Sequence, residues 1–415
     1  MKRILFIMLE IESASGICTR NVAERLVEHG YAVDILSYST EIQFDLGCLY
    51  QIHPKFNIRM RKKFYSSKVI SCIFSYLFKL QVGLTKFMWP WNSPLFTWKL
   101  YRKILSLDKI NSYDCIIAVY SQLDPILATA WLKRRYANKK IISYFLDSLS
   151  AGPTPTFLSE KNKLKKGLWW EKTLLKGVDG VIYMKSSQNH HEKYSKDKEY
   201  YEKVTFLDIP MLKLSEENFS NKTQQYVSSK YNKSLKLTYV GSLPLNIRNP
   251  LYGLKVLAAC ESASRLEINF VGQMPQSNSF LIDCSKIVRV NWVGYVKHEA
   301  ALQYIKEADV LLNFGNKVEG MVPSKIFEYI SYGKPILSFV PDMWEPTIPY
   351  LDCYSAACTI VETENFSNNV LKAQRFLTHL PVCNFTKDDL NEKFFLNTPE
   401  SFADYIDLQL RNVKV

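Results

Sequence analysis

The chain has 415 residues, of which 47% are hydrophobic and 22% charged, and its formal net charge is +13. This composition is typical of globular proteins, excludes a low-complexity or disordered chain, and at this length favours two domains. The nine cysteines form no C-x-x-C pair and the six histidines are dispersed, which indicates neither a disulfide framework nor a metal site and predicts a reducing, cytoplasmic compartment.

The N-terminal segment predicts a βαβ unit. Residues 3–9 are apolar and indicate a strand, and a loop with Ser13, Ser15 and Gly16 follows. A helix is expected from about 19 to 29 and a second strand at 32–36. In doubly wound sheets, ligands bind at loops of this kind, where the strands end. The sequence has no G-x-G-x-x-G here, so the dinucleotide fingerprint is absent.

Residues 51–110 carry 12 basic residues and one acidic residue, and they account for much of the excess positive charge in residues 1–210, where 32 Lys and Arg face 19 Asp and Glu. The same window is rich in Phe, Tyr and Trp. The window includes a basic cluster at 59–63. Basic residues mixed with aromatic ones favour contact with an anionic membrane surface. A solvated basic face over an aromatic core is the simpler alternative. A nucleic-acid groove has similar composition, but no nucleic-acid fold pattern accompanies it. No run of apolar residues is long enough to span a bilayer.

Three further strands are predicted in the first half, at 115–120, 141–146 and 180–184. Asp147 follows the second of them and begins a polar loop. His190 and His191 lie in a charged stretch and are expected to be exposed to solvent. The first domain is predicted to end at residue 210, with a polar linker at 211–234.

A second α/β series begins after the linker. Strands are expected at 235–240, 266–271, 288–293 and 308–314, with helices at 251–263 and 299–308 between them. This alternation predicts a second parallel sheet with helices on both faces, in a domain of residues 235–395. The last stretch, 396–415, is amphipathic and is expected to form a helix that packs back on the first domain.

The most informative segment is residues 321–335, which read Met-Val-Pro-Ser-Lys-Ile-Phe-Glu-Tyr-Ile-Ser-Tyr-Gly-Lys-Pro. Ser324 is a start signal for a helix, and Gly333 followed by Pro335 is a stop signal. Lys325 and Glu328 lie one turn apart on one face. The segment follows a predicted buried strand and a polar loop. Such a loop and helix can hold a phosphate, with Lys325 supplying charge and Glu328 accepting hydrogen bonds from sugar hydroxyls. An ordinary capped helix is the alternative.

This segment resembles the donor-binding motif of GT-B glycosyltransferases, particularly retaining family 4 and its bacterial polysaccharide-building relatives. The resemblance implies two Rossmann-like domains that face each other across a cleft. It also implies that Glu328 binds the ribose and that Ser324 and Lys325 bind the diphosphate. The family pattern has a second glutamate eight residues earlier, where this sequence has Gly320, with Glu319 adjacent.

The resemblance extends to other predicted loops. It implies that Gly16 approaches the donor diphosphate, that Gly241 and Arg248 contact its phosphates, and that Tyr295 lies beside the base. The alternative for Arg248 is an exposed loop arginine. Asp147 matches a family position near the acceptor, where the usual preceding histidine is Leu146. Its implied role is acceptor positioning or general base, and a turn-initiating Asp is the alternative.

The implied activity is transfer of a sugar from a nucleoside diphosphate sugar, of UDP or GDP type, to a hydroxyl of a glycan acceptor. Without a metal or cofactor, Lys325 and Arg248 would stabilise the departing diphosphate. The basic, aromatic window suggests a lipid-linked acceptor at the inner membrane face. Two alternatives remain: another GT-B enzyme, such as a nucleotide-sugar epimerase, and a non-catalytic nucleotide-binding partner subunit.

Overall fold

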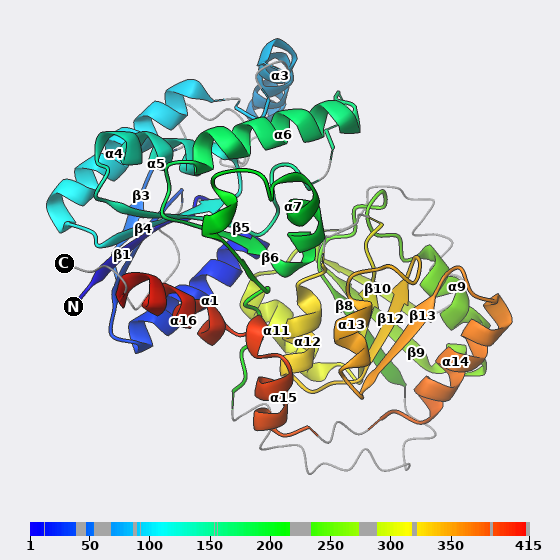
Figure 1. Ribbon diagram of the computed structural model, residues 1–415. Helices are drawn as coiled ribbons and strands as arrows, with labels where there is room; N and C mark the ends of the chain where they lie inside the picture. Colours follow the sequence, from blue (N-terminus) through cyan, green and yellow to red (C-terminus); the bar gives the residue numbers. More distant parts are fainter. Residues whose placement is uncertain are drawn as a thin grey trace. The chain divides into compact units, whose positions relative to one another are not determined.

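A computed structural model describes the chain except for residues 12, 39–46, 54–67, 86–88, 92, 153, 156, 216–233, 274–288, 318–321, 382–384 and 412–415. The chain divides into two compact units (Figure 1). Unit 1 comprises Met1–Pro210 together with Pro399–Val415, and unit 2 comprises Met211–Thr398. Each unit is an α/β domain built on one parallel sheet, which confirms the predicted fold class of two Rossmann-like domains.

Unit 1 contains a seven-stranded parallel sheet in the order β3-β2-β1-β4-β5-β6-β7. Its strands are β1 Arg3–Ile7, β2 Ala32–Ser37, β3 Leu49–Gln51, β4 Cys115–Tyr120, β5 Lys140–Phe145, β6 Gly180–Met184 and β7 Val204–Leu207. Its helices are α1 Ala14–Glu28, α3 Lys68–Thr85, α4 Pro94–Asn111, α5 Leu123–Arg135, α6 Glu160–Leu175, α7 Gln188–Tyr194 and α16 Pro399–Arg411. The central strands are buried on both faces, which explains their unbroken apolar sequences.

Unit 2 contains a six-stranded parallel sheet in the order β10-β9-β8-β11-β12-β13. Its strands are β8 Leu235–Val240, β9 Leu266–Val271, β10 Arg289–Gly294, β11 Val310–Phe314, β12 Ile336–Val340 and β13 Ala357–Val361. Its helices are α9 Leu251–Ala259, α11 His298–Glu307, α12 Lys325–Ser331, α13 Ile348–Asp352, α14 Phe366–Thr378 and α15 Lys387–Lys393. In both sheets the strand order reverses beside the first strand, at β1/β4 and at β8/β11. Loops at the carboxyl ends of those strand pairs are where such folds bind ligands.

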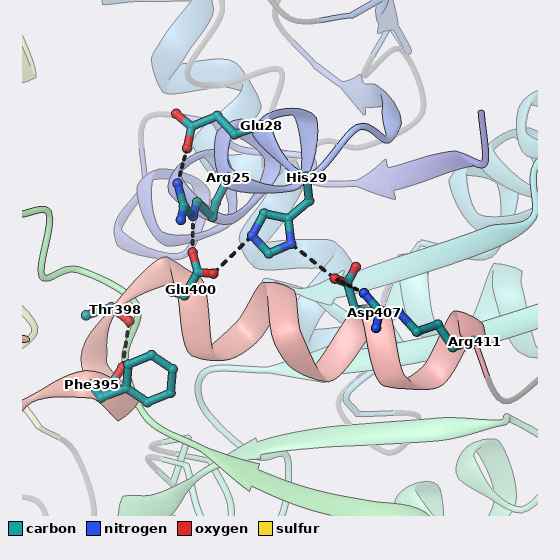
Figure 2. Close-up of polar contacts among 8 residues, drawn as sticks. All are labelled: Arg25, Glu28, His29, Phe395, Thr398, Glu400, Asp407 and Arg411. Atoms are coloured by element: carbon teal, nitrogen blue, oxygen red, sulfur yellow. Dashed lines mark hydrogen bonds and ion pairs between the residues drawn. The ribbon is translucent and has the colours of Figure 1, made fainter. Parts of the chain in front are cut away.

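The C-terminal helix α16 packs on α1 of unit 1 through a polar cluster (Figure 2). The His29 ring lies between two carboxylates of α16, with Nε2 3.0 Å from Glu400 and Nδ1 3.1 Å from Asp407. Arg25, one turn before His29, also pairs with Glu400. The apolar side chains of α16, including Phe402 and Ile406, are buried below these contacts. Helix α16 therefore belongs structurally to unit 1, although it follows unit 2 in the sequence.

Candidate functional site

The loops at the β8/β11 reversal of unit 2 contain most of the residues that the sequence singled out. Gly241 and Arg248 follow β8, and α12 with Lys325 and Glu328 follows the loop after β11. The two loops meet at the end of β8. There the Tyr329 hydroxyl of α12 accepts a hydrogen bond of 2.8 Å from the Val240 amide, and the hydroxyl of Tyr239 accepts one of 2.8 Å from Arg248. Parallel strands end at a common edge, and sheets of this kind bind ligands at the position where the strand order reverses.

Glycines allow the loops after β8 and β9 to approach each other closely. Gly272 has φ +135°, and a Cβ atom at this position would lie 2.1 Å from the carbonyl oxygen of Gly241. The Gly241 amide donates to Val271 at 2.8 Å, and the Gly272 amide donates to Gly294 at 2.8 Å. Only glycine fits where two backbones are this close. Backbone, without side chains, therefore forms this part of the edge of the sheet.

Arg248 is held in a fixed orientation. Its Nε donates to Asn316 Oδ1 at 3.0 Å, in addition to the bond from Nη1 to Tyr239. Asn316 is buried, and its backbone N–H donates to Glu345 Oε1 at 3.1 Å. The guanidinium is therefore oriented before any ligand arrives, which reduces the entropic cost of binding an anion. Arg248 is therefore not a loosely held loop side chain, and its contact with a phosphate stays a prediction.

Glu345 is a buried anchor for this network. Its side chain is 3% exposed, and its other oxygen accepts bonds from the amide and hydroxyl of Thr347. Burial raises the pKa of this carboxyl, while the bonds from Thr347 and Asn316 and the charge of Arg248 oppose the rise. Glu345 was not predicted from the sequence, because the loop after β12 carries no recognisable motif.

Three ionisable side chains, two from α12 and one from α11, lie next to one another. Lys325 Nζ lies 2.6 Å from Glu328 Oε2, and His298 Nε2, at the start of α11, lies 3.4 Å from Glu328 Oε1. Glu328 is 5% exposed, so its carboxylate is nearly removed from water and both oxygens are next to nitrogen atoms. The sequence predicted that Lys325 and Glu328 would share a face, and they do. His298 was missed; its signal was its place as the first residue of α11, four positions after β10 ends at Gly294.

Helix α12 begins at Lys325, directly after the predicted start signal, but the expected capping contact is not made. Ser324 has helical backbone angles and makes no side-chain capping bond, so it is not the expected cap. The end of the helix is as predicted, because Gly333 adopts φ +57°. Tyr295 is 70% exposed beside the end of β10. Glu319 and Gly320 lie outside the described residues, as does the basic cluster 59–63.

In unit 1, packing within the domain explains why residue 16 is a glycine. Helix α1 begins at Ala14, five residues earlier than predicted, so Gly16 lies in its first turn and not in a loop. A Cβ atom on Gly16 would be 2.2 Å from the carbonyl oxygen of Ile11. The Ser13 hydroxyl accepts a 3.1 Å bond from the Gly16 amide and caps the helix. The glycine is therefore required for the contact between α1 and the loop after β1.

Asp147 is exposed at the start of the loop that follows β5. Its surroundings raise the pKa of its carboxyl through desolvation. Because solvent reaches the side chain, this rise gives only weak support for a general base. The position at a carboxyl end of the sheet remains suitable for contact with an acceptor.

The loop after Asp147 is held by three side chains that bind every polar group of Ser150. Glu171 accepts from its amide at 2.8 Å, Lys163 donates to its carbonyl oxygen at 2.6 Å, and His190 Nε2 lies 2.9 Å from its hydroxyl. Gly167 of α6 leaves no room for a Cβ against this loop, with Ser150 Cα 2.7 Å from that position. The loop is therefore rigidly attached to α6 and α7.

The charges that hold Ser150 are buried. Burial raises the pKa of Glu171 to about 7, opposed by the bonds to Ser150 and by the charge of Lys163. Burial lowers the pKa of Lys163 to about 8, opposed by the charge of Glu171. The expectation that His190 and His191 are exposed is wrong for both residues. His190 is partly buried against Ser150, and His191 is fully buried and stacks on Tyr183 at 3.9 Å between ring centroids.

One group of possible metal ligands lies in unit 1. Among the described residues, ligand atoms of His29, Glu400 and Asp404 come within 4.8 Å of one another. Both nitrogens of His29 already contact carboxylates, and Arg25 pairs with Glu400. The group is therefore better explained as the attachment of α16 to α1.

Comparison with solved structures identifies the fold. HepE of Anabaena, solved in complex with UDP-glucose, matches at 12% identity over 100% of both chains with a TM-score of 0.61. WaaG, a glycosyltransferase involved in lipopolysaccharide biosynthesis, matches at 12% identity over 97% of this chain and 99% of that chain, with a TM-score of 0.56. A UDP-N-acetylglucosamine 2-epimerase matches at 8% identity over 96% and 91%, with a TM-score of 0.50.

No family model matches the sequence, and no curated protein matches it. At these identities, the similarity to solved structures establishes the fold alone. The chain has the GT-B fold, as the segment 321–335 predicted, and proteins with different activities share that fold.

Proposed function

We propose that the protein is a glycosyltransferase that transfers a sugar from a UDP- or GDP-type nucleoside diphosphate sugar to a hydroxyl group of a glycan acceptor. The observation that carries this proposal is the convergence of Arg248 with the Lys325–Glu328 pair at the β8/β11 strand reversal. An oriented guanidinium and an ammonium suit a diphosphate, and a nearly buried carboxylate suits a vicinal diol. The similarity to HepE, solved with UDP-glucose, supports the same class of donor.

The chemistry follows from the charges. When the bond between sugar and diphosphate breaks, negative charge grows on the leaving oxygen. Arg248 and Lys325 would stabilise that charge, and Arg248 is already oriented by Tyr239 and Asn316. Cationic side chains can perform this task without a divalent ion, so we propose a metal-independent reaction. Retention of configuration is proposed on the resemblance of residues 321–335 to family 4.

On the acceptor side we propose unit 1, with Asp147 near the incoming hydroxyl. The loop of Asp147 is fixed through Ser150, which suits a surface that must position a substrate. The acceptor is proposed to be lipid-linked, as in bacterial surface polysaccharide assembly at the inner membrane face. The basic composition of residues 51–110 supports this, and WaaG supplies a solved example of the fold in lipopolysaccharide synthesis. Among the described residues no helix meets the length and hydropathy needed to cross a bilayer.

The first experiment is thermal unfolding with UDP, GDP, ADP and CMP. A ligand at a hundredfold excess over its Kd adds about 2.7 kcal/mol to the stability of the folded state. We expect one nucleoside diphosphate to stabilise the wild type and not the Glu328→Ala variant. Glu299→Ala changes an exposed glutamate on α11 and should retain the full effect. Stabilisation that survives in Glu328→Ala would show that the nucleotide binds elsewhere.

The second experiment separates the reactions that the fold can support. The purified protein is incubated with the sugar form of the stabilising nucleotide and a lipid extract. A transferase produces a glycosylated lipid and free nucleoside diphosphate. An epimerase converts the donor without any lipid. A binding subunit binds the nucleotide and leaves the donor intact.

A further inference from the structure

Helix α3 has a continuous apolar stripe that faces solvent. At 100° per residue, its exposed large apolar side chains fall within about 120° of the helix circumference. They are Val69 (69% exposed), Ile70 (38%), Ile73 (54%), Tyr76 (64%), Leu77 (40%) and Leu80 (46%). The side chain of Lys79 is exposed and lies outside this stripe. We refer to these six residues as the α3 stripe.

The described part of the chain gives α3 little packing. None of the α3 side chains that the structure describes belongs to the hydrophobic core of unit 1. A helix of 18 residues is marginal in water by itself, and its stability ordinarily comes from packing of its apolar face. An exposed apolar surface of this kind usually marks a contact with another molecule.

The charge around α3 indicates what that molecule is. The 12 basic residues of 51–110 face one acidic residue, Asp108, which is 8% exposed and pairs with Lys139 at 2.8 Å. The exposed face of α4 has the same character, because Leu95 and Trp98 are exposed and Arg102 lies over the Trp98 ring at 5.7 Å. Apolar and aromatic side chains in a segment whose sequence has a large excess of positive charge suit the boundary between anionic headgroups and acyl chains.

We propose that α3 lies in the plane of an anionic bilayer surface, with the α3 stripe inserted between the acyl chains and with Lys79 of the same helix among the headgroups. A second copy of the chain would cover the stripe equally well. It would, however, bring two strongly basic segments together, which like-charge repulsion opposes. The inference gives a location to the membrane contact in the proposed function. It concerns a surface apart from the nucleotide site, so either proposal can fail without the other.

The insertion of apolar side chains predicts a particular salt dependence. Attraction between surface charges is screened as ionic strength rises, whereas burial of the α3 stripe is not. Binding to phosphatidylglycerol vesicles should therefore weaken between about 0.1 M and about 0.5 M NaCl but persist at the higher concentration. Binding to phosphatidylcholine vesicles should be weaker at low salt.

The test is co-sedimentation of the full chain with these vesicles, using Ile73→Glu and Leu371→Glu. Both residues are 54% exposed, but Leu371 lies on α14 of unit 2. A charged group in the stripe opposes insertion, so Ile73→Glu should lower phosphatidylglycerol affinity about tenfold or more. Leu371→Glu should bind like the wild type. Because both side chains face water, both variants should keep the thermal stability of the wild type.

Two further measurements complete the test. Tyr76→Trp should show a blue shift of tryptophan emission with phosphatidylglycerol vesicles, measured against the wild type, because the new indole enters the bilayer. Light scattering without vesicles tests the alternative partner. The proposal is overturned if the wild type stays in the supernatant, if both glutamate variants lose binding equally, or if Ile73→Glu only dissociates a dimer. Nucleotide stabilisation retained in Ile73→Glu keeps the proposed function separate from this result.

Discussion

Lys325 and Glu328 form an ion pair within one turn of α12, with Nζ and Oε2 2.6 Å apart. Each of the two residues proposed to bind the donor therefore has the other as its partner. A nucleoside diphosphate would have to attract Lys325 away from Glu328 with its phosphates and offer the ribose hydroxyls to Glu328 in return. A ligand with only one of these two groups leaves one member of the pair without compensation, which is costly in a partly buried site.

This ion pair predicts that the Lys325→Met variant loses more affinity for a nucleoside diphosphate than for the corresponding nucleoside. Affinity for the stabilising nucleoside diphosphate should fall about tenfold to a hundredfold, since charge-assisted bonds to phosphate contribute about 1.5–3 kcal/mol. Affinity for the corresponding nucleoside should change much less. Isothermal titration with both ligands measures this, with Lys306→Met as the control at an exposed lysine of α11. Equal losses for both ligands would mean that Lys325 supports the site without contacting phosphate.

Alanine substitutions at Gly272 and Gly294 can be compared to test the close approach of the loops after β8 and β9. Gly272→Ala places a Cβ 2.1 Å from the Gly241 carbonyl oxygen, whereas Gly294→Ala meets nothing within 4 Å, and both residues have positive φ. Gly294→Ala should cost about 1–2 kcal/mol for its backbone conformation alone. Gly272→Ala should cost clearly more and should weaken nucleotide binding. Urea unfolding of both variants gives the comparison, and equal costs would contradict the close approach of the two loops.

Glu171 predicts a dependence of stability on pH. Its pKa is raised from 4.5 to about 7, so the folded state keeps a proton that the unfolded chain has released. The resulting stabilisation is complete below pH 4.5 and is lost as the pH rises through about 7. Glu171→Gln does not titrate. Relative to this variant, the wild type should therefore lose free energy of unfolding between about pH 5 and about pH 7.

Urea unfolding at both pH values tests this prediction. Glu160→Gln, which changes an exposed glutamate of the same helix, should follow the wild type. The comparison stays below pH 8 because Lys163, with its pKa lowered to about 8, titrates above that range. Parallel curves for wild type and Glu171→Gln would show that the carboxyl titrates normally.

The contacts of His29 with α16 are expected to slow local opening of that helix. Both of its ring nitrogens lie near carboxylates of α16, and only the imidazolium can donate from both. Replacing His29 with Ala should speed hydrogen exchange of the amides in Pro399–Arg411 and leave α14 unchanged. His379→Ala, at an exposed position after α14, is the control. Unchanged exchange in α16 would mean that its apolar face alone holds the helix.

The lowered pKa of Glu400 predicts that the contact between α16 and α1 weakens at low pH. Burial pushes this pKa upward, but the bond from Arg25 and the charges of Arg25 and His29 outweigh burial and hold it below the ordinary value. A lowered pKa contributes stability above the ordinary value, and that contribution disappears as the pH falls through the folded-state value. The protection of the α16 amides against exchange, corrected for the pH dependence of the intrinsic exchange rate, should therefore fall on acidification before that of the core strands does.

The sequence predicted the parts of the fold that depend on local pattern. Strands such as 115–120 and 310–314 are buried on both faces, so their apolar runs are unmistakable. Edge strands β3, β7 and β13 were not predicted, since they are short and less buried. The buried inner strand β12 was also missed, because it directly follows the helix stop signal at Gly333 and Pro335. The start of α1 was placed too late because Ser13 caps it through Gly16, a residue that suggested a loop.

The candidate site was predictable only where one segment contains its residues. Lys325 and Glu328 share a helix, so their spacing revealed their pairing. The contacts of Ser150 with Lys163, Glu171 and His190 span 13 to 40 residues, and no single-sequence pattern links them. His298 joins Glu328 across 30 positions for the same reason. Contacts of this kind depend on the strand order, which brings distant loops to one edge.

The return of α16 to unit 1 also determines the order of events during synthesis. Unit 2 is one uninterrupted stretch, Met211–Thr398, whereas unit 1 needs residues from both ends of the chain. While the ribosome makes unit 2, the surface of α1 that α16 will cover remains bare, and unit 1 is incomplete. Proteins usually fold their N-terminal domain first. In this chain the domain that begins first is completed last, so a chain released before residue 399 has a whole second domain and an unfinished first one.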